Sequence, residues 1–168
     1  MYKLFKKLRS RLLVYLTHNM ALPVLKLIRK PEVFPYTPGE LMQFPDGSLG
    51  KDLVLFLEKK ELQLLPYYAR HDIKHILLDY DTTDEGEGSL QCFMLGNGHI
   101  SFPVLATVMY GYLTMPEHWG AFRKAFRRGR VSNSLEDWKW FAILLQSTNE
   151  LKQKINPINN QNHPLCKP

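Results

Sequence analysis

At 168 residues the chain is long enough for one domain with a hydrophobic core and too short for two of ordinary size. The net charge of +6 is unevenly distributed, because residues 1–30 hold eight Lys or Arg and no acid, a net +8 that leaves −2 for the remainder. A nucleic-acid-binding domain would carry its basic face on the folded body of the chain, so this distribution excludes that class. The two cysteines are too few for a disulfide framework, which indicates a reducing compartment. The chain has no run of about 18 apolar residues, which excludes a membrane-spanning helix.

Apolar residues that recur every three or four positions predict helices along most of the chain, and no segment alternates as a strand does. Residues 1–30 are expected to form a basic amphipathic helical segment whose helix ends before Pro23. A helical domain that binds metal and prenyl lipid is expected over residues 31–155, and a disordered tail over 156–168. The fold class is therefore predicted as all-α, a single compact domain of about seven helices.

Proline, glycine and capping residues divide this domain into its predicted helices. A turn at residues 45–48 precedes a helix over about 49–62, with Phe56 among its inward residues. The next helix starts near Pro66 and ends near Asp79. The later helices are expected to start at Thr82, in a capping box with Glu85, at Ile100, at Pro116, and at Ser132 or Ser134, the last with Leu135, Trp138, Ala142 and Leu145 inward.

The sequence His-Asp-Ile-Lys-His at residues 71–75 carries the clearest chemical pattern, and Glu87 follows it after eleven further residues. Two histidines four positions apart lie on one helical face, with Asp72 close to that face. Imidazole and carboxylate donors together suit a divalent transition metal, zinc first. Glu87 has no local structural role and can arrive from the next helix. We therefore predict a zinc site on two consecutive antiparallel helices, with the catalytic and metal-binding residues His71, Asp72, His75 and Glu87.

Alternatives to a catalytic zinc site of this kind stay open. In one alternative the two histidines are half-exposed surface residues, because histidine is common in this chain. In another, Asp72 only pairs with Lys74 or Arg70. A zinc peptidase would place Glu after the first histidine, and the shorter Asp reaches less far toward a bound water. A metal phosphohydrolase of the His…His-Asp…Asp type needs an earlier histidine on a neighbouring helix, and only His18 lies upstream. Asp79 is a substitute ligand candidate.

The whole pattern, with Gly86 directly before the glutamate, resembles the signature of the coenzyme Q biosynthesis protein 4 family. Upstream, Pro-Asp-Gly-Ser-Leu-Gly at residues 45–50 resembles the family's Pro-x-Gly-(Ser/Thr)-Leu-Gly turn, and the basic turn at 127–130 precedes the last helix as it does in the family. The resemblance covers residues 35–153 of the chain. One departure lies at residues 78–81, where Leu-Asp-Tyr-Asp stands and family members often carry a glycine.

The resemblance implies an all-α zinc protein of ubiquinone biosynthesis whose ligands match His71, Asp72, His75 and Glu87. The implied substrate is a polyprenylated benzoquinol precursor, and the implied reaction is C1 decarboxylation coupled to hydroxylation, a lyase activity on a hydroxy-methoxy-polyprenylbenzoate. Implied partners are other quinone biosynthesis enzymes. The expected location is peripheral, on the cytoplasmic face of a bacterial inner membrane or the matrix side of the mitochondrial inner membrane. A non-catalytic prenyl-lipid-binding scaffold is the alternative function, and a homodimer is an open option.

A polyprenyl tail needs an apolar groove, and the stretch rich in Met and aromatic residues from Phe93 onward suits an adaptable wall, with plain helix–helix core as the alternative. The predicted lipid-binding residues are Phe93, Met94, Phe102, Leu105, Val108, Met109, Tyr112 and Leu113. An anionic head group is assigned to Arg123, Arg127, Arg128 and Arg130, unless these form a solvated helix end. The acid-free N-terminal segment fits an anionic membrane surface, a docked core helix or a mitochondrial targeting segment.

Overall fold

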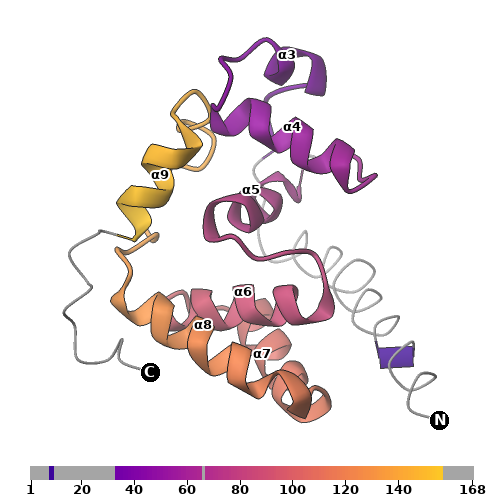
Figure 1. Cartoon of the computed structure of the whole chain (residues 1–168), viewed down its shortest axis with the longest axis vertical. Helices are drawn as coiled ribbons and strands as arrows, with labels where there is room; N and C mark the ends of the chain where they lie inside the picture. Colours follow the sequence, from indigo (N-terminus) through magenta and orange to yellow (C-terminus); the bar gives the residue numbers. More distant parts are fainter. Residues whose placement is uncertain (1–7, 10–32, 66, 157–168) are drawn as a thin grey trace.

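The computed structural model describes residues 8–9, 33–65 and 67–156 (Figure 1). Within this part the chain forms seven α-helices and one 3₁₀ turn, and its only β-type pairing is an isolated bridge between Ser48 and Ser147. The all-α prediction is thus confirmed. The elements are α3 (Pro38–Met42), α4 (Leu49–Lys59), α5 (Ala69–Leu78), α6 (Asp84–Gly96), α7 (Phe102–Thr114), η2 (Pro116–His118), α8 (Trp119–Val131) and α9 (Thr148–Ile155).

The predicted N-terminal helical segment over residues 1–30 and the predicted tail over 156–168 lie almost wholly outside the described residues, as does Pro66. These assignments therefore stay predictions, and so do the domain boundaries drawn from them. Among the helices that the structure describes, none combines the length and the apolar content needed to cross a bilayer.

The helices form two groups with α5 between them. Figure 1 shows α3, α4 and α9 at one end of the molecule and α6, α7 and α8 at the other. Helix α5 contacts α4, α9 and α6, and its apolar face is fully buried at Ile73, Leu77 and Leu78. Because α5 is held from both sides, the short loop that follows it brings the start of α6 close to its polar face.

Glycines allow α6 and α8 to approach until their backbones touch. A β-carbon added at Gly129 of α8 would lie 2.1 Å from the carbonyl oxygen of Phe93 on α6. In the reverse direction, one added at Gly96 of α6 would lie 2.1 Å from the carbonyl oxygen of Phe126 on α8. Both distances are well inside van der Waals contact, so only glycine fits at these positions without a backbone shift. This contact fixes where α6 lies.

Helix α6 begins one residue later than the sequence predicts, with Thr83 and not Thr82 as its N-cap. The Thr83 hydroxyl accepts a hydrogen bond from the Gly86 N–H at 3.2 Å, while the Thr83 N–H donates to the Asp81 carboxylate at 3.0 Å. The predicted capping box is wrong because Asp81 fixes the backbone before the helix and so moves its start. Glu85 is left to pair with a histidine of η2.

The last predicted helix is also wrong. Residues 132–147 follow an irregular path, and the C-terminal helix is α9 instead. Of the residues expected to point inward from a helix in this segment, Leu135 is buried and Trp138 is half-buried, whereas Ala142 and Leu145 are exposed. The apolar residues of the segment therefore contact the core separately and do not form one buried helical face.

Long-range backbone hydrogen bonds explain why this segment is not a helix. The carbonyl oxygens of Gln146 and Leu144 accept from the first two N–H groups of α4, at 3.0 and 2.8 Å. These N–H groups have no partner within their own helix, so the irregular segment satisfies them. At its other end, the Asn97 side chain accepts from the Leu135 N–H at 2.9 Å. The tertiary partners replace the bonds that a helix would make.

Two substitutions on α8 test the contact with α6. Gly129→Ala forces a β-carbon into the Phe93 carbonyl and should lower the free energy of unfolding by about 2 kcal/mol or more. Gly120→Ala is the matched control, because nothing lies within 4 Å of the added carbon, and it should leave stability unchanged or raise it by up to about 1 kcal/mol. Urea unfolding followed by circular dichroism measures both. Equal stability of the two variants would contradict the close contact.

Candidate metal centre

The two histidines of α5 and the glutamate of α6 meet at one point. His75 lies one turn after His71, so both imidazoles project from the same side of α5. Glu87 lies in the first turn of α6, directly across from them. The His75 side chain is fully buried, whereas the side chains of His71 and Glu87 keep 32% and 26% of their surface exposed. The group therefore has a closed side at His75 and an open side at His71.

The three donor groups form a nearly equilateral triangle. The distance between the two Nε2 atoms is 3.0 Å. Glu87 Oε2 lies 3.1 Å from His71 Nε2, and Glu87 Oε1 lies 3.0 Å from His75 Nε2. Donors around tetrahedral zinc, each about 2.0–2.2 Å from the ion, are about 3.4 Å apart, so the triangle fits zinc after an expansion of a few tenths of an ångström. Within the described residues no other His, Cys, Asp and Glu side chains form a comparable group.

Two neighbours orient His75. Its Nδ1 lies 2.9 Å from the backbone carbonyl of Tyr80, so Nδ1 carries the proton and donates it. In the neutral ring Nε2 then offers its lone pair toward the triangle, which is the arrangement that metal-binding histidines use. The ring of Phe56 stacks on the other side, with 6.3 Å between the ring centroids and planes 16° apart. Phe56 is expected from the sequence only as an inward residue of α4, and nothing in its helical spacing indicates a contact with the site.

The electrostatics of the triangle favour a positive charge at its centre. Burial acts to lower the pKa of His75, but the hydrogen bond and charge of Glu87, the Tyr80 carbonyl and the charge of Asp72 outweigh burial and raise it. Burial acts to raise the pKa of Glu87, and the hydrogen bonds and charges of the two histidines overcome it and hold this pKa below its usual range. Two imidazole nitrogens 3.0 Å apart repel unless a proton or a metal ion lies between them.

Asp72, the fourth predicted ligand, does not join the triangle. It lies buried on α5 and its negative charge helps to raise the pKa of His75, but its carboxylate is not among the donors that converge. Asp79, the substitute candidate, instead forms an ion pair with Lys152 of α9. Asp79 also has a φ of 57°, a left-handed conformation that glycine adopts most easily and Asp tolerates. This is the stretch in which the resembling family often has glycine.

The basic residues beside the ligands on α5 face aromatic rings. The Lys74 ammonium lies 5.3 Å from the centroid of the Trp140 ring, and the Arg70 guanidinium lies 5.6 Å from that of Phe141. Burial, together with the charge of Arg70, lowers the pKa of Lys74 to about 8. Both side chains thus help to attach α5 to the irregular segment that contains the two rings.

The structure separates the residues predicted to bind a lipid tail into three groups. Phe93 and Met94 are core residues of α6, and Val108 and Tyr112 are partly buried against that core. The others lie on the solvent side of α7. These residues do not line one common groove, and lipid binding by them stays a prediction. The exposed members are Phe102, Leu105, Met109 and Leu113.

The arginines predicted to bind an anionic head group also divide. Arg123, Arg127 and Arg130 are exposed on α8. Arg128 points inward, donates to the Leu78 carbonyl at 2.6 Å and lies 5.3 Å from the centroid of the Phe93 ring. Arg128 therefore connects the end of α5 to α8, and head-group binding stays a prediction for the other three.

The fold and the triangle define a helical protein with a candidate metal centre. The chain matches no protein-family model and no curated protein. Among solved structures, its fold is similar to that of a protein from Nostoc punctiforme PCC 73102 described as a "putative ubiquinone biosynthesis protein", with a TM-score of 0.60 and 19% sequence identity over 90% of this chain and 80% of that chain. At this identity the likeness shows the shared fold, and membership of the coenzyme Q biosynthesis protein 4 family stays a prediction.

Loss of one imidazole tests the triangle as a metal site. We expect zinc to bind to the full-length protein, and His75→Ala to weaken its affinity by about 100-fold or more, because a buried donor is removed. His118→Ala is the matched control, since this histidine pairs with Glu85 outside the triangle and its loss should leave zinc affinity unchanged. Competition with a chromophoric chelator measures both affinities. Unchanged zinc affinity of the His75 variant would rule the site out.

Zinc binding should also depend on pH, because protons and metal compete for the same nitrogens. The raised pKa of His75 means that this competition begins at a higher pH than for an ordinary histidine. We expect zinc to raise Tm more at about pH 8 than at about pH 6, because fewer protons compete for the donor nitrogens at the higher pH. Differential scanning calorimetry with and without zinc measures the two shifts. Equal shifts at both pH values would argue against imidazole ligands.

Proposed function

We propose that the protein is a zinc-dependent enzyme of ubiquinone biosynthesis that decarboxylates a polyprenylated benzoquinol precursor at C1. The observation that carries the proposal is the triangle of His71, His75 and Glu87. Two further findings support it: the motif resembles that of a quinone biosynthesis family, and the Nostoc protein of similar fold is described with the same pathway. The hydroxylation that the resemblance couples to decarboxylation belongs to this proposal and would take dioxygen as its oxidant. One oxygen atom would enter at C1, the other would leave as water, and the ring would become a quinone.

The donor set suits a catalytic zinc ion. Three protein ligands are the number that catalytic zinc sites use, with a further position left for water or substrate. Zinc is redox-silent, and when bound it supplies Lewis acidity toward an anionic oxygen such as a carboxylate or phenolate. His71 Nε2, His75 Nε2 and the Glu87 carboxylate would hold the ion.

The surrounding residues leave the triangle accessible from one side only. His75 is closed off by Phe56, and the Tyr80 carbonyl fixes its tautomer, so its side of the triangle has no access for substrate. His71 and Glu87 remain partly exposed, so an aromatic acid would approach from their side. In the reaction the bond between C1 and the carboxylate carbon breaks and carbon dioxide leaves. In decarboxylation alone, the electron pair of this bond stays on C1, which takes up a proton. The polyprenyl chain holds the substrate in the membrane. We therefore propose that the enzyme is peripheral to the membrane and lies near other enzymes of the pathway.

A labelled substrate tests the proposal. Full-length protein loaded with zinc should release labelled carbon dioxide from a carboxyl-labelled prenylated hydroxybenzoate, and Glu87→Gln should lower the rate by about 100-fold or more. Glu85→Gln is the matched control, because Glu85 lies on the same turn of α6, is half exposed and pairs with His118. Headspace mass spectrometry measures the gas. If the zinc-loaded protein binds the substrate and releases no carbon dioxide, the enzyme proposal fails and the scaffold function replaces it.

A further inference from the structure

The outward face of α7 is wholly apolar. The helix contains no charged residue, and every position that the structure exposes on it carries Phe, Leu, Ala or Met. Phe102 keeps 77% of its surface exposed, Met109 63% and Leu113 78%. Spacings of three and four residues place these side chains, with Leu105, in one row along the helix. A surface helix of a freely soluble protein normally presents polar residues here, so this apolar row needs a partner.

The rest of α7 is already occupied by contacts within the chain. Gly111 is buried beneath the Phe122 ring, where an added β-carbon would lie 3.1 Å from the ring. On another side, the Tyr110 hydroxyl donates to the Arg9 carbonyl at 3.0 Å, and the Arg9 guanidinium donates to the Thr114 carbonyl at 2.9 Å. These contacts turn the apolar row outward, away from the core that α6 and α8 form.

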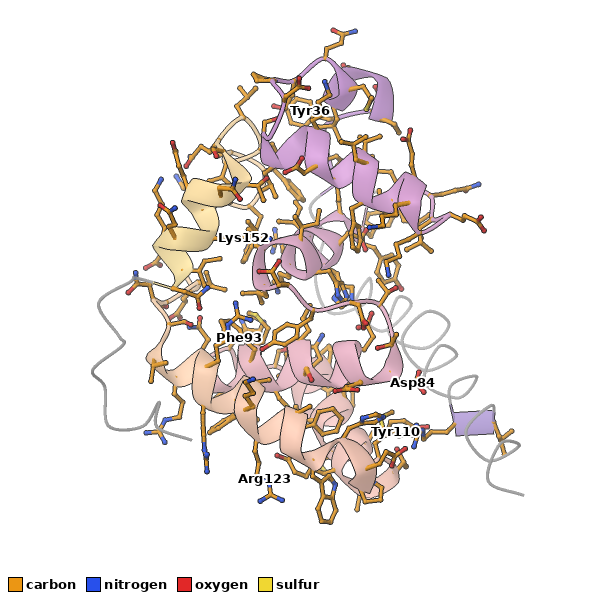
Figure 2. The ribbon with its side chains drawn as sticks, in the orientation of Figure 1. Tyr36, Asp84, Phe93, Tyr110, Arg123 and Lys152 are labelled. Carbon is orange, nitrogen blue, oxygen red and sulfur yellow. The ribbon has the colours of Figure 1, made fainter. Side chains whose placement is uncertain are left out.

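A basic row on α8 continues this surface. Helix α8 has no acidic residue, and Arg123, Arg127 and Arg130 are exposed along one of its faces. Trp119, exposed on the same face, connects the two helices because its indole N–H donates to the Tyr112 carbonyl of α7 at 2.9 Å. Figure 2 shows Arg123 projecting from the end of the molecule opposite α3. We name the apolar row and this basic row together the α7–α8 patch.

We propose that the α7–α8 patch docks the protein on a lipid bilayer that contains anionic lipids. Apolar side chains of α7 enter the boundary between head groups and acyl chains, and the arginines of α8 contact lipid phosphates. Trp119 lies at the junction, where an indole favours the interface between apolar and polar regions. The proposal gives the membrane location of the proposed function a defined surface, but its structural basis is independent of the metal centre.

Charge complementarity favours this occupant over two others. A second copy of the chain, packed through the same patch about a twofold axis, would offer the arginines of α8 no opposite charge, because neither α7 nor α8 contains an acidic residue. The N-terminal 30 residues already contact α7 on another side through Arg9, and their eight cations would be repelled by the basic row. An anionic bilayer offers both an apolar layer for α7 and negative charges for α8.

Vesicle co-sedimentation of the full-length protein tests the patch. Wild type should bind vesicles of phosphatidylcholine mixed with phosphatidylglycerol, bind phosphatidylcholine alone at least about tenfold more weakly, and lose binding at high salt. Met109→Glu with Leu113→Glu should lower the partition coefficient by about tenfold or more, because two inserted side chains are replaced by anions. Leu145→Glu is the matched control, since Leu145 is 63% exposed on the irregular segment, and it should bind as wild type does.

Arg123→Glu with Arg127→Glu provides a second test, against the exposed Lys139→Glu as control. This pair should also lose binding by about tenfold, and circular dichroism should show the wild-type fold in all variants. The proposal is overturned if wild type does not bind, if the patch variants bind as wild type does, or if a concentration-dependent dimer of wild type is broken by the α7 variant. Vesicle binding is measured without zinc or substrate, so its failure is distinct from a failure to release carbon dioxide.

Discussion

The backbone contact between α6 and α8 is the constraint on which both the candidate metal centre and the α7–α8 patch depend. Gly96 and Gly129 bring the two helices together with no side chain between them, so α6 has little freedom to rotate or slide. With this face of α6 occupied, its first turn presents Glu87 to α5. The same contact holds α8 with its basic row in solvent. One helix pair therefore positions a candidate metal ligand on one side and a charged surface on another.

The candidate centre is built for a cation by its surroundings as much as by its ligands. The hydrogen bond from His75 to the Tyr80 carbonyl directs the basic nitrogen of the ring toward Glu87, and Phe56 keeps water from the other face. Burial alone would make this histidine a weaker base, so the carboxylates near it are what keep the site attractive to a proton or a metal ion. Asp72 contributes to this as a buried charge and not as a donor of the triangle.

The candidate metal centre and the α7–α8 patch occupy different parts of the fold. The triangle opens beside His71, between α5 and α6. Helices α7 and α8, which carry the apolar row and the arginines, lie at the end of the molecule opposite α3 (Figure 1). The residues from Phe93 to Leu113 that the sequence offers as one lipid-lining set are divided by the fold between core and surface. Sequence composition predicts contact with lipid, and the packing shows which of these side chains are exposed.

The sequence by itself determined the helical class, the helices α4, α5, α7 and α8, and the pairing of His71 with His75, because apolar spacing and a four-residue repeat are properties of one helix. The tertiary structure alone decided the rest. It selected Glu87 over Asp72 as the third donor, because the loop after α5 and the α6–α8 contact fix how two helices meet. It also kept residues 132–147 from forming a helix, because their carbonyls satisfy the N-terminus of α4, a partner remote in sequence.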